Sequence, residues 1–224
     1  MIRINFVVEG QTEETFVRDV LAPHFGVRGV YCVASCVSTG KKRGIVYKGG
    51  MTSFEKAEQD IIRWMKQDSN AFCATMFDLY GLPNNFPGFE KAIEMSAYDR
   101  VVFLERNLAD KIKYQKFIPY IQLHEFEALL FSDPDVVGTV LRGGDATVRK
   151  LKNICSQFNT PEEINNKPES APSRRLREAC PAYDKVSSGP LIAKKIGLDK
   201  LRQACPHFSD WVSRLESLVF TPAS

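Results

Sequence analysis

The sequence contains no C-x-x-C pair and no cysteine–histidine spacing typical of a zinc site. Its cysteines are isolated, and several of them lie in apolar segments that resemble strands. They are Cys32, Cys36, Cys73, Cys155, Cys180 and Cys205. We therefore expect free, reduced thiols in a hydrophobic core, and neither a disulfide framework nor a structural zinc centre.

Long apolar runs and nucleotide-binding fingerprints are also absent from the sequence. No segment reaches the length that a membrane-spanning helix requires, and the amino-terminal residues lack the long apolar region of a secretory signal. There is no Walker-type or dinucleotide-binding fingerprint, which argues against ATP or NAD as a ligand. The expectation is a cytoplasmic protein without membrane contact.

Charge and composition leave the class of partner open. The formal net charge of +3 neither demands nor excludes nucleic acid, because a basic groove can lie within a balanced total. The 224 residues, 44% of them hydrophobic, are enough for one large domain or for a domain with a smaller appendage.

Strand and helix patterns alternate along the first half of the chain. Short runs rich in apolar and β-branched residues predict strands at residues 2–8, 30–37, 72–77, 100–104 and 117–123. Apolar residues at helical spacing predict helices at residues 12–21, 53–68 and 89–97. Strands that alternate with helices indicate an α/β fold with a mostly parallel sheet flanked by helices.

The later part of the sequence is helical in pattern. Its last segment, residues 191–218, is interrupted at Gly197 and Pro206, which are typical helix-breaking residues. We therefore expect two parts, an α/β domain over residues 1–132 and a helical C-terminal subdomain over residues 133–224.

Four carboxylates follow predicted strands. Glu9 comes directly after the first strand, Asp78 after the third, and Glu125 and Glu127 after the last. Because parallel strands end at the same edge of a sheet, where open α/β sheets bind ligands, we expect these side chains to approach one another. Carboxylates at one edge repel unless they are protonated or bridged by a cation, and magnesium prefers such oxygen ligands. The pattern predicts a magnesium site suited to phosphodiester chemistry.

The roles of Glu125 and Glu127 stay open in the sequence. On an extended segment two residues so spaced point to opposite faces, so that only one of them can reach the site. Solvated residues at the start of a helix are the alternative for both. His124, beside them, is expected to be a hydrogen-bonded structural histidine.

Two clusters of basic residues are candidates to contact a nucleic-acid backbone. The first lies in a glycine-rich connection, and the second opens a helix and continues into the next one. Their members are Lys41, Lys42, Arg43 and Lys48, and Arg174, Arg175 and Lys185. A basic loop with an aromatic residue is suited to gripping phosphate or RNA. A solvated loop and a charged helix face are the alternatives.

Several segments together resemble a known family. They read VEGQTEETFV, MFDLYGLP, YIQLHEFEALLFSD, APSRRL, YDKVSSGPLIA and CPHFSDW. The first two resemble the Toprim fold of topoisomerases, primases and OLD-type nucleases, and the whole chain is similar to the DUF4276 family of Toprim-like proteins. The resemblance implies a Toprim-like sheet and RNA cleavage. Members of this family include the nuclease effector of a PARIS-type anti-phage system, which cleaves tRNA and is held by a partner ATPase.

The resemblance also implies roles for individual residues. Glu9 matches the Toprim glutamate, a general acid–base or metal-supporting group, and Asp78 matches the first aspartate of the Toprim Asp-x-Asp pair. Tyr80 stands where the second aspartate is expected, so Glu125 or Glu127 would supply the missing oxygen. The expected catalytic residues are Glu9, Asp78 and Glu125, and the expected ligands of Mg²⁺ or Mn²⁺ are Glu9, Asp78 and Glu127.

Three functional hypotheses follow. The first is a metal-dependent nuclease in bacterial anti-phage defence, which cleaves RNA in preference to DNA, with tRNA favoured, and is controlled by a partner ATPase. A homodimer is expected, since Toprim nucleases often act as dimers. The second is a non-catalytic Toprim-like module that binds a partner ATPase or nucleic acid, with Tyr80 marking lost catalysis. The third is a phosphatase that uses the same carboxylates.

Overall fold

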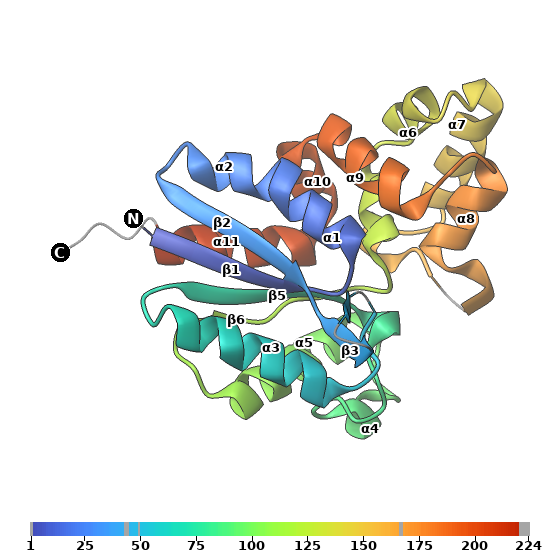
Figure 1. The fold of residues 1–224 in the computed structure, drawn as a ribbon. Coiled ribbons are helices and arrows are strands. Elements are labelled where there is room, and N and C mark those ends of the chain that lie inside the picture. Colours follow the sequence, from blue (N-terminus) through green and yellow to red (C-terminus); the bar gives the residue numbers. More distant parts are fainter. Residues whose placement is uncertain (1, 43–44, 49, 166–167, 220–224) are drawn as a thin grey trace.

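The computed structural model describes residues 2–42, 45–48, 50–165 and 168–219 (Figure 1). A parallel sheet lies at its centre. Its strands are β1 (Ile2–Val8), β2 (Val30–Cys36), β5 (Phe72–Asp78), β6 (Phe117–Ile118) and β7 (Ile121–Gln122). The order is β2-β1-β5-β6, with β7 also paired to β5, and each of these pairs is parallel. The mostly parallel α/β sheet predicted from the sequence is confirmed.

Helices cover both faces of the sheet. On one face lie α1 (Gln11–Phe16), its π-helical continuation Val17–Leu21, α2 (Ala22–Gly26) and α11 (Pro206–Val219); on the other lie α3 (Phe54–Gln67) and α5 (Ala97–Ile112). Side chains along β1 alternate between the two faces of the sheet. Phe6 and Val8 pack in the hydrophobic core on the side of α1 and α11, whereas Val7 packs in the core on the side of α3 and α5. Since both faces are buried, the strands appear in the sequence as continuous apolar runs.

Residues 100–104 lie in α5 and do not form the strand that the sequence predicts. Ser96 caps this helix, its Oγ accepting a backbone N–H three residues on at 3.2 Å. Val101, Leu104 and Leu108 are buried at helical spacing on the face that meets the sheet. A short apolar run does not by itself distinguish a strand from one face of a helix, which explains the error.

The strand predicted at residues 117–123 is interrupted. Pro119 and Tyr120 separate β6 from β7, because proline has no N–H to give to the ladder. The Tyr120 N–H instead bonds Thr75 Oγ1 at 2.9 Å. The chain still follows β5, so that its next residues arrive at the same edge of the sheet.

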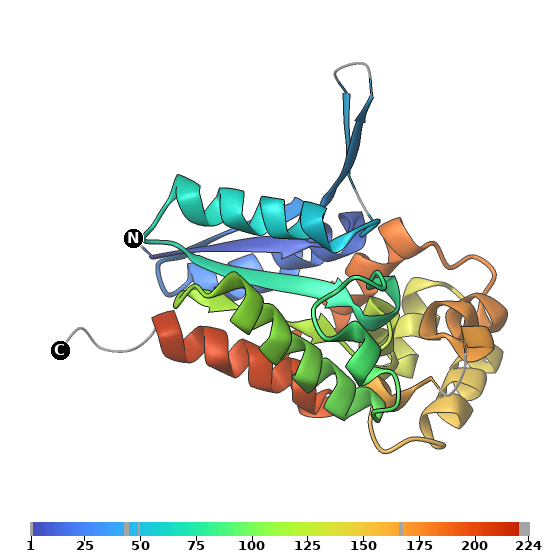
Figure 2. The same cartoon turned by 90° about the horizontal axis from the view of Figure 1, so that it is seen from below.

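An antiparallel hairpin of β3 (Ser38–Lys42) and β4 (Ile45–Lys48) stands out from the sheet (Figure 2). The sequence indicates this segment only as a basic, glycine-rich loop. The helix predicted at residues 89–97 is reduced to α4 (Phe89–Ala92).

The chain after residue 133 forms helices. Those that gather beyond the carboxyl ends of the strands include α6 (Pro134–Val140), α7 (Gly144–Cys155) and α8 (Pro172–Ala179) (Figure 1). The next helix, α9 (Lys185–Ile196), leads from them to α10 (Leu198–Ala204), which packs against α11. The breaks predicted at Gly197 and Pro206 are confirmed. α11 then returns along the sheet, where the Trp211 ring stacks on Tyr120 with centroids 4.4 Å apart. None of the helices in the described ranges is long and apolar enough to span a bilayer.

The cysteines are free, and each is buried or half-buried, as the sequence predicts. Burial raises the pKa of the Cys32 and Cys73 thiols to about 12. They therefore stay protonated and unreactive at neutral pH.

Candidate active site at the carboxyl ends of the strands

The ends of β1 and β5 bring Glu9 and Asp78 together. Glu9 directly follows β1, and its N–H bonds the Met76 carbonyl of β5 at 3.2 Å. Its side chain also turns to β5, where Oε2 accepts the Asp78 N–H at 3.2 Å. The two residues lie side by side at the end of the sheet that faces the C-terminal helices (Figure 1).

Gly81 makes room for the Glu9 carboxylate. It ends the short 3₁₀ turn Leu79–Gly81 that follows β5. A Cβ at this position would lie 2.3 Å from Glu9 Oε2 and 2.5 Å from Glu9 Cδ, closer than atoms approach in proteins. The Glu9 carbonyl also accepts the Gly50 N–H at 2.9 Å. Backbone groups therefore hold Glu9 from two sides.

Gly81→Ala is expected to displace Glu9 and to lower the free energy of unfolding by about 1–3 kcal/mol, the usual cost of overpacking. Chemical denaturation measures the loss. Gly26→Ala is the matched control, because no atom lies within 4 Å of the Cβ that it adds. Equal stability of the two variants would contradict the close approach of Gly81 to Glu9.

Glu13 belongs to the same site, although sequence reasoning missed it. Its Oε2 accepts the Gly10 N–H at 2.9 Å, and its side chain is buried. The available signal was its spacing, because a glutamate three residues after a helix N-cap folds back onto the cap, here beside Glu9. Burial, with a smaller effect of the neighbouring Glu9 and Glu127, raises the pKa of Glu13 to about 7.

Lys185, in the first turn of α9, stands between Asp78 and Glu127. Its ammonium lies 3.5 Å from Asp78 Oδ2 and 3.3 Å from Glu127 Oε2. Asp78 Oδ1 accepts the Phe126 N–H at 2.9 Å. The fully buried Glu127 accepts the Tyr183 hydroxyl on Oε1 at 3.1 Å. Each carboxylate is thus fixed on one oxygen and faces the ammonium with the other.

Negative charge exceeds positive charge in this cluster. Within the described part of the chain, Lys185 contacts Asp78 and Glu127, and two more carboxylates, Glu9 and Glu13, are close enough to act on the same groups electrostatically. Burial raises the pKa of Glu9, Asp78 and Glu127 above the usual range. Burial opposes charge on Lys185 as well, but the carboxylates, Asp78 foremost, raise its pKa and keep it protonated. The cluster therefore favours either bound protons or a further cation.

Glu125 and Glu127 point in different directions. Glu125 is the extended residue before the 3₁₀ stretch Phe126–Ser132. It is half-buried, and its Oε2 accepts the Ser173 N–H at 3.0 Å in the first turn of α8. Glu127, inside the 3₁₀ stretch, reaches Lys185 instead. Glu127 is thus a member of the carboxylate cluster, and Glu125 lies at its border.

Tyr80, where the sequence resemblance leads us to expect an aspartate, turns toward Asn165 and His124. Its hydroxyl is hydrogen-bonded to the Asn165 amide, and its ring centroid lies 5.5 Å from that of His124. The side chain is 45% exposed. Tyr80 therefore places a neutral phenol at the surface, where an aspartate would place a metal-binding carboxylate.

His124 has an unusual backbone conformation and an unpaired ring atom. Its φ is 63°, in the left-handed region that side chains rarely adopt. The ring is buried, and Nδ1 has no hydrogen-bond partner among the described residues. The expectation of a hydrogen-bonded histidine is therefore wrong for this atom. Burial lowers the pKa of His124 to about 4, which keeps the imidazole neutral.

The basic hairpin is described only by its backbone. Lys41 and Lys42 lie in β3 and Lys48 lies in β4, whereas Arg43 falls outside the described residues. The hairpin begins two residues after β2, close in sequence to the edge of the sheet that holds Glu9.

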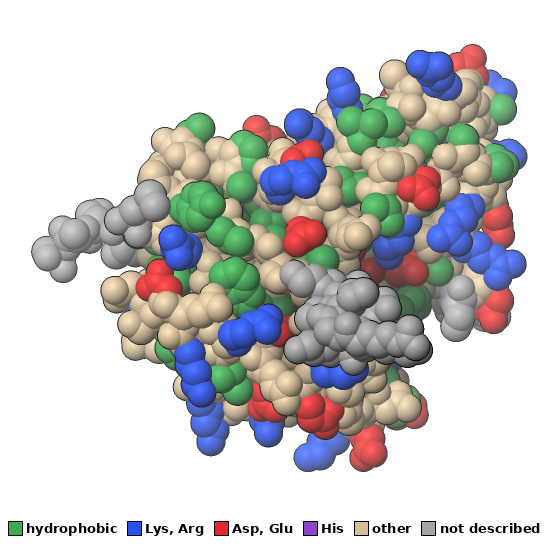
Figure 3. Space-filling view, viewed as in Figure 1, with side chains coloured by type: hydrophobic (Ala, Val, Ile, Leu, Met, Phe, Trp, Pro, Cys, Tyr) green, Lys and Arg blue, Asp and Glu red, His purple; other side chains and the backbone are tan. Residues whose placement is uncertain are grey.

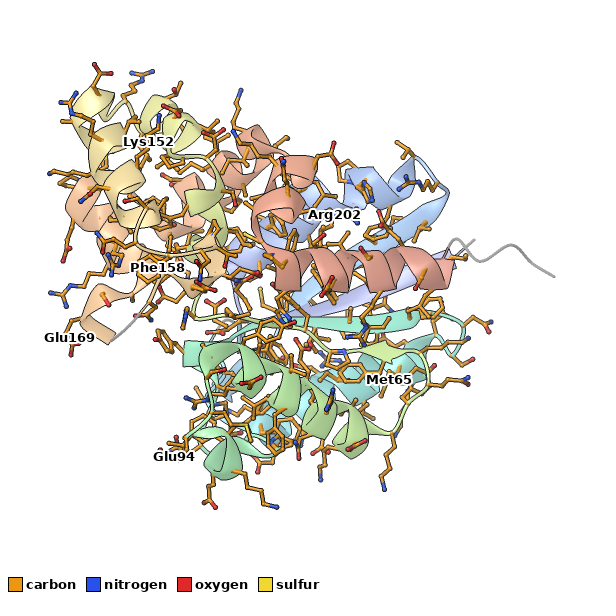
Figure 4. The ribbon with its side chains drawn as sticks, turned by 180° about the vertical axis from the view of Figure 1, so that it is seen from behind. Met65, Glu94, Lys152, Phe158, Glu169 and Arg202 are labelled. Atoms are coloured by element: carbon orange, nitrogen blue, oxygen red, sulfur yellow. The ribbon has the colours of Figure 1, made fainter. Side chains whose placement is uncertain are left out.

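The basic residues of α8 have partners of their own. Arg174 pairs with Glu178 at 3.0 Å. Arg175 donates to the Ser170 carbonyl at 2.8 Å and covers the ring of Phe158, which is labelled in Figure 4, at 5.6 Å. Figure 3 shows acidic side chains recessed in a hollow near the C-terminal helices, with Lys and Arg side chains on the surface beside it. Among the predicted nucleic-acid-binding residues whose side chains are described, Lys185 is the one that lies within the carboxylate cluster.

The family model of DUF4276, a domain of unknown function, matches residues 8–216. The chain belongs to the DUF4276 family. The matched range of this DUF4276 protein contains every member of the carboxylate cluster, from Glu9 near its start to Lys185 near its end. No curated protein sequence matches the chain.

Two solved structures match this DUF4276 chain along nearly its whole length, at low identity. One is the C-terminal region of the Burkholderia pseudomallei OLD protein, with 15% identity and a TM-score of 0.49, covering 98% of this chain and 99% of that chain. Another is the C-terminal region of the Xanthomonas campestris pv. campestris OLD protein, with 14% identity and a TM-score of 0.41, covering 95% and 97%.

The DUF4276 cluster has the donor chemistry of a divalent-cation site. Carboxylate oxygens suit Mg²⁺ and Mn²⁺. Burial, with a smaller effect of the neighbouring carboxylates, raises the pKa of Glu9 and Asp78. Within the described ranges no three Asp, Glu, His or Cys side chains already converge as ligands. Asp78 and Glu127 face the Lys185 ammonium instead. The residues therefore fit a hard cation in chemistry and charge, once it replaces or shares the contacts of Lys185.

Proposed function

We propose that this DUF4276 protein is a metal-dependent nuclease of the Toprim type, which hydrolyses phosphodiester bonds in RNA in preference to DNA. The observation that carries the proposal is the cluster of buried carboxylates around the Lys185 ammonium, at the ends of β1 and β5. Carboxylates with such perturbed pKa values gather at functional sites. The sequence resemblance supports the same reaction through Glu9 and Asp78.

The proposed roles follow from where each side chain is held. Asp78 and Glu127 would bind Mg²⁺ or Mn²⁺, together with Glu9. When bound, the ion would polarise the phosphate and lower the pKa of a water ligand. Glu9, held by backbone groups, would accept the proton of the attacking water. Lys185 would neutralise charge that develops on a phosphate oxygen, and Glu125 stays a proposed catalytic residue at the border of the cluster.

The biological setting is also a proposal, and it rests on the sequence resemblance. It comprises tRNA as the polymer, a cytoplasmic role in anti-phage defence, a partner ATPase that restrains the activity, and a homodimer. The basic residues predicted from the sequence, Lys41, Lys42, Arg43, Lys48, Arg174 and Arg175, would contact the RNA backbone.

The test is cleavage of a substrate panel by the purified full chain. The panel holds tRNA, plasmid DNA, single-stranded DNA and the monoester p-nitrophenyl phosphate, each with Mg²⁺, Mn²⁺ or EDTA. We expect cut tRNA with either ion and intact tRNA in EDTA. Hydrolysis of the monoester without cleavage of any polymer would contradict the proposal and favour a phosphatase.

A non-catalytic module is the second candidate, and one observation favours it. Tyr80 occupies the position of an expected aspartate and is engaged with Asn165. If no polymer is cut and calorimetry detects no binding of Mg²⁺ or Mn²⁺, this candidate replaces the nuclease.

A further inference from the structure

A cavity of about 620 Å³ opens between the starts of α5 and α11, the green and red helices of Figure 2. Its walls combine an aromatic ring, apolar side chains, hydroxyls, an imidazole, an amide and two carboxylates. They include Tyr98, Leu123, His124, Asn165, Glu162 and Glu163. Among the described residues that line the cavity, none is Lys or Arg. These walls suit a flat, partly apolar group and are unsuited to a phosphate.

The cavity borders the carboxylate cluster through the residues that follow β5 and β7. His124 lines the cavity, and the next residue, Glu125, lies at the border of the cluster. The His124 carbonyl accepts the N–H of Tyr80 at 3.2 Å, and Tyr80 is two residues beyond Asp78. The residues that line the cavity at His124 are therefore directly continuous with those that border the carboxylate cluster.

His124 is a buried residue of the cavity wall with an unusual backbone conformation. Its side chain is only 5% exposed, yet Nδ1 has no partner among the described residues. Its φ of 63° adds backbone strain at the same residue. Buried polar atoms without a partner are rare in native proteins, and strained residues gather at binding sites. The combination marks the wall at His124 as strained; Nδ1 is itself inaccessible to solvent, and the contacts with a ligand come from other wall residues.

Tyr98 provides an aromatic surface in the wall of the cavity. Its side chain is 49% exposed, and its ring is fixed edge-on against the His207 ring, with centroids 5.6 Å apart. A half-exposed, braced aromatic ring is the feature on which proteins stack unpaired bases. The Glu163 carboxylate, on the exposed side of the cavity, can only accept hydrogen bonds.

We propose that this cavity binds one unstacked nucleobase of the substrate, on the nucleotide next to the scissile phosphate. The base stacks on Tyr98, and its exocyclic amino group donates to Glu163, so that adenine and cytosine are preferred to uracil. The proposal rests on the proposed nuclease function and adds a base-reading subsite to it.

The test measures binding without cleavage. Fluorescein-labelled five-nucleotide RNAs of adenine, cytosine or uracil are titrated with the full chain in EDTA, and anisotropy gives the affinities. Tyr98→Ala is expected to weaken binding of the adenine and cytosine RNAs by about 5-fold or more, the usual effect of losing one stacking platform. Tyr31→Ala is the matched control, because Tyr31 is also half-exposed but lies on β2, beneath Arg3.

Glu163→Met, a change at an exposed side chain, tests the second contact, because methionine has no oxygen to accept the amino hydrogen. It is expected to weaken binding of the adenine and cytosine RNAs and to leave binding of the uracil RNA unchanged. Unchanged binding in Tyr98→Ala, or equal affinity of wild type for the three RNAs, would overturn the proposal. Because these readouts need no metal and no catalysis, they are independent of the cleavage panel. Base-selective binding by a chain that cuts nothing would refute the nuclease and leave the subsite in place.

Discussion

Glu9→Gln is expected to reduce metal-dependent phosphodiester cleavage by about 10²- to 10⁴-fold, the usual contribution of a general acid–base group. The amide keeps the size of the side chain and an oxygen that accepts the Asp78 N–H, now 3.2 Å from Glu9 Oε2. It can neither take up a proton nor carry the charge that attracts a cation. The rate of tRNA cleavage in Mg²⁺, measured under single-turnover conditions, gives the size of the loss.

Glu14→Gln is the control, since Glu14 lies on the same helix as Glu13 but outside the contacts of the cluster. The stability of Glu9→Gln shows whether a loss of activity comes from the missing carboxylate or from unfolding. Because burial already raises the pKa of Glu9, removal of its charge costs no stability in the metal-free protein. A variant that is stable and fully active would remove Glu9 from the mechanism. A variant that is inactive because it unfolds would contradict the electrostatic description of the cluster.

Lys185→Met is expected to lower the free energy of unfolding of the metal-free protein by about 2–3 kcal/mol at pH 8. The change removes the ammonium that lies 3.3 Å from Glu127 and 3.5 Å from Asp78, and it leaves buried carboxylates without a counter-charge. The expected loss is below that for a fully buried pair because 34% of the Lys185 side chain is exposed. Urea denaturation at pH 8 with EDTA measures it.

Two further measurements distinguish lost charge from lost packing at Lys185. Addition of Glu127→Gln to Lys185→Met is expected to restore part of the stability, because the amide keeps the Tyr183 contact without the charge. Mg²⁺ is expected to stabilise Lys185→Met more than the wild type, since the ion takes the place of the ammonium. Lys195→Met, an exposed position on the same helix, serves as the control. A stability of Lys185→Met equal to that of the control would contradict the prediction.

Sequence reasoning located Glu9 and Asp78 because local signals mark them. In both cases a buried apolar strand ends abruptly in a carboxylate, and parallel strands place such ends at one edge. The partnership with Lys185 has no local signal, because 107 residues separate it from Asp78 along the chain. Only the packing of α9 against α1 and the 3₁₀ stretch determines that contact.

The sequence left the choice between Glu125 and Glu127 open for a geometric reason. An extended segment alternates its side chains, whereas the segment here changes from extended at Glu125 to 3₁₀ at Phe126. Their relative direction then depends on a turn that no periodicity reveals. His124 belongs to the same transition, because its left-handed backbone conformation joins β7 to this segment. The strand prediction for residues 100–104 was wrong for a simpler reason, since one apolar turn of a buried helix has the composition of a strand.

The return of α11 along the sheet has a consequence for synthesis on the ribosome. Trp211 completes the core against Phe6 and Tyr120, and Lys185 reaches the carboxylates from the last part of the chain. A nascent chain of 132 residues would already carry Glu9, Glu13, Asp78 and Glu127 but not their counter-charge. The growing polypeptide thus passes through a stage in which its acidic site exists and its fold cannot close. The nuclease proposed above would therefore lack Lys185 and the packing of Trp211 until α9 and α11 have been synthesised.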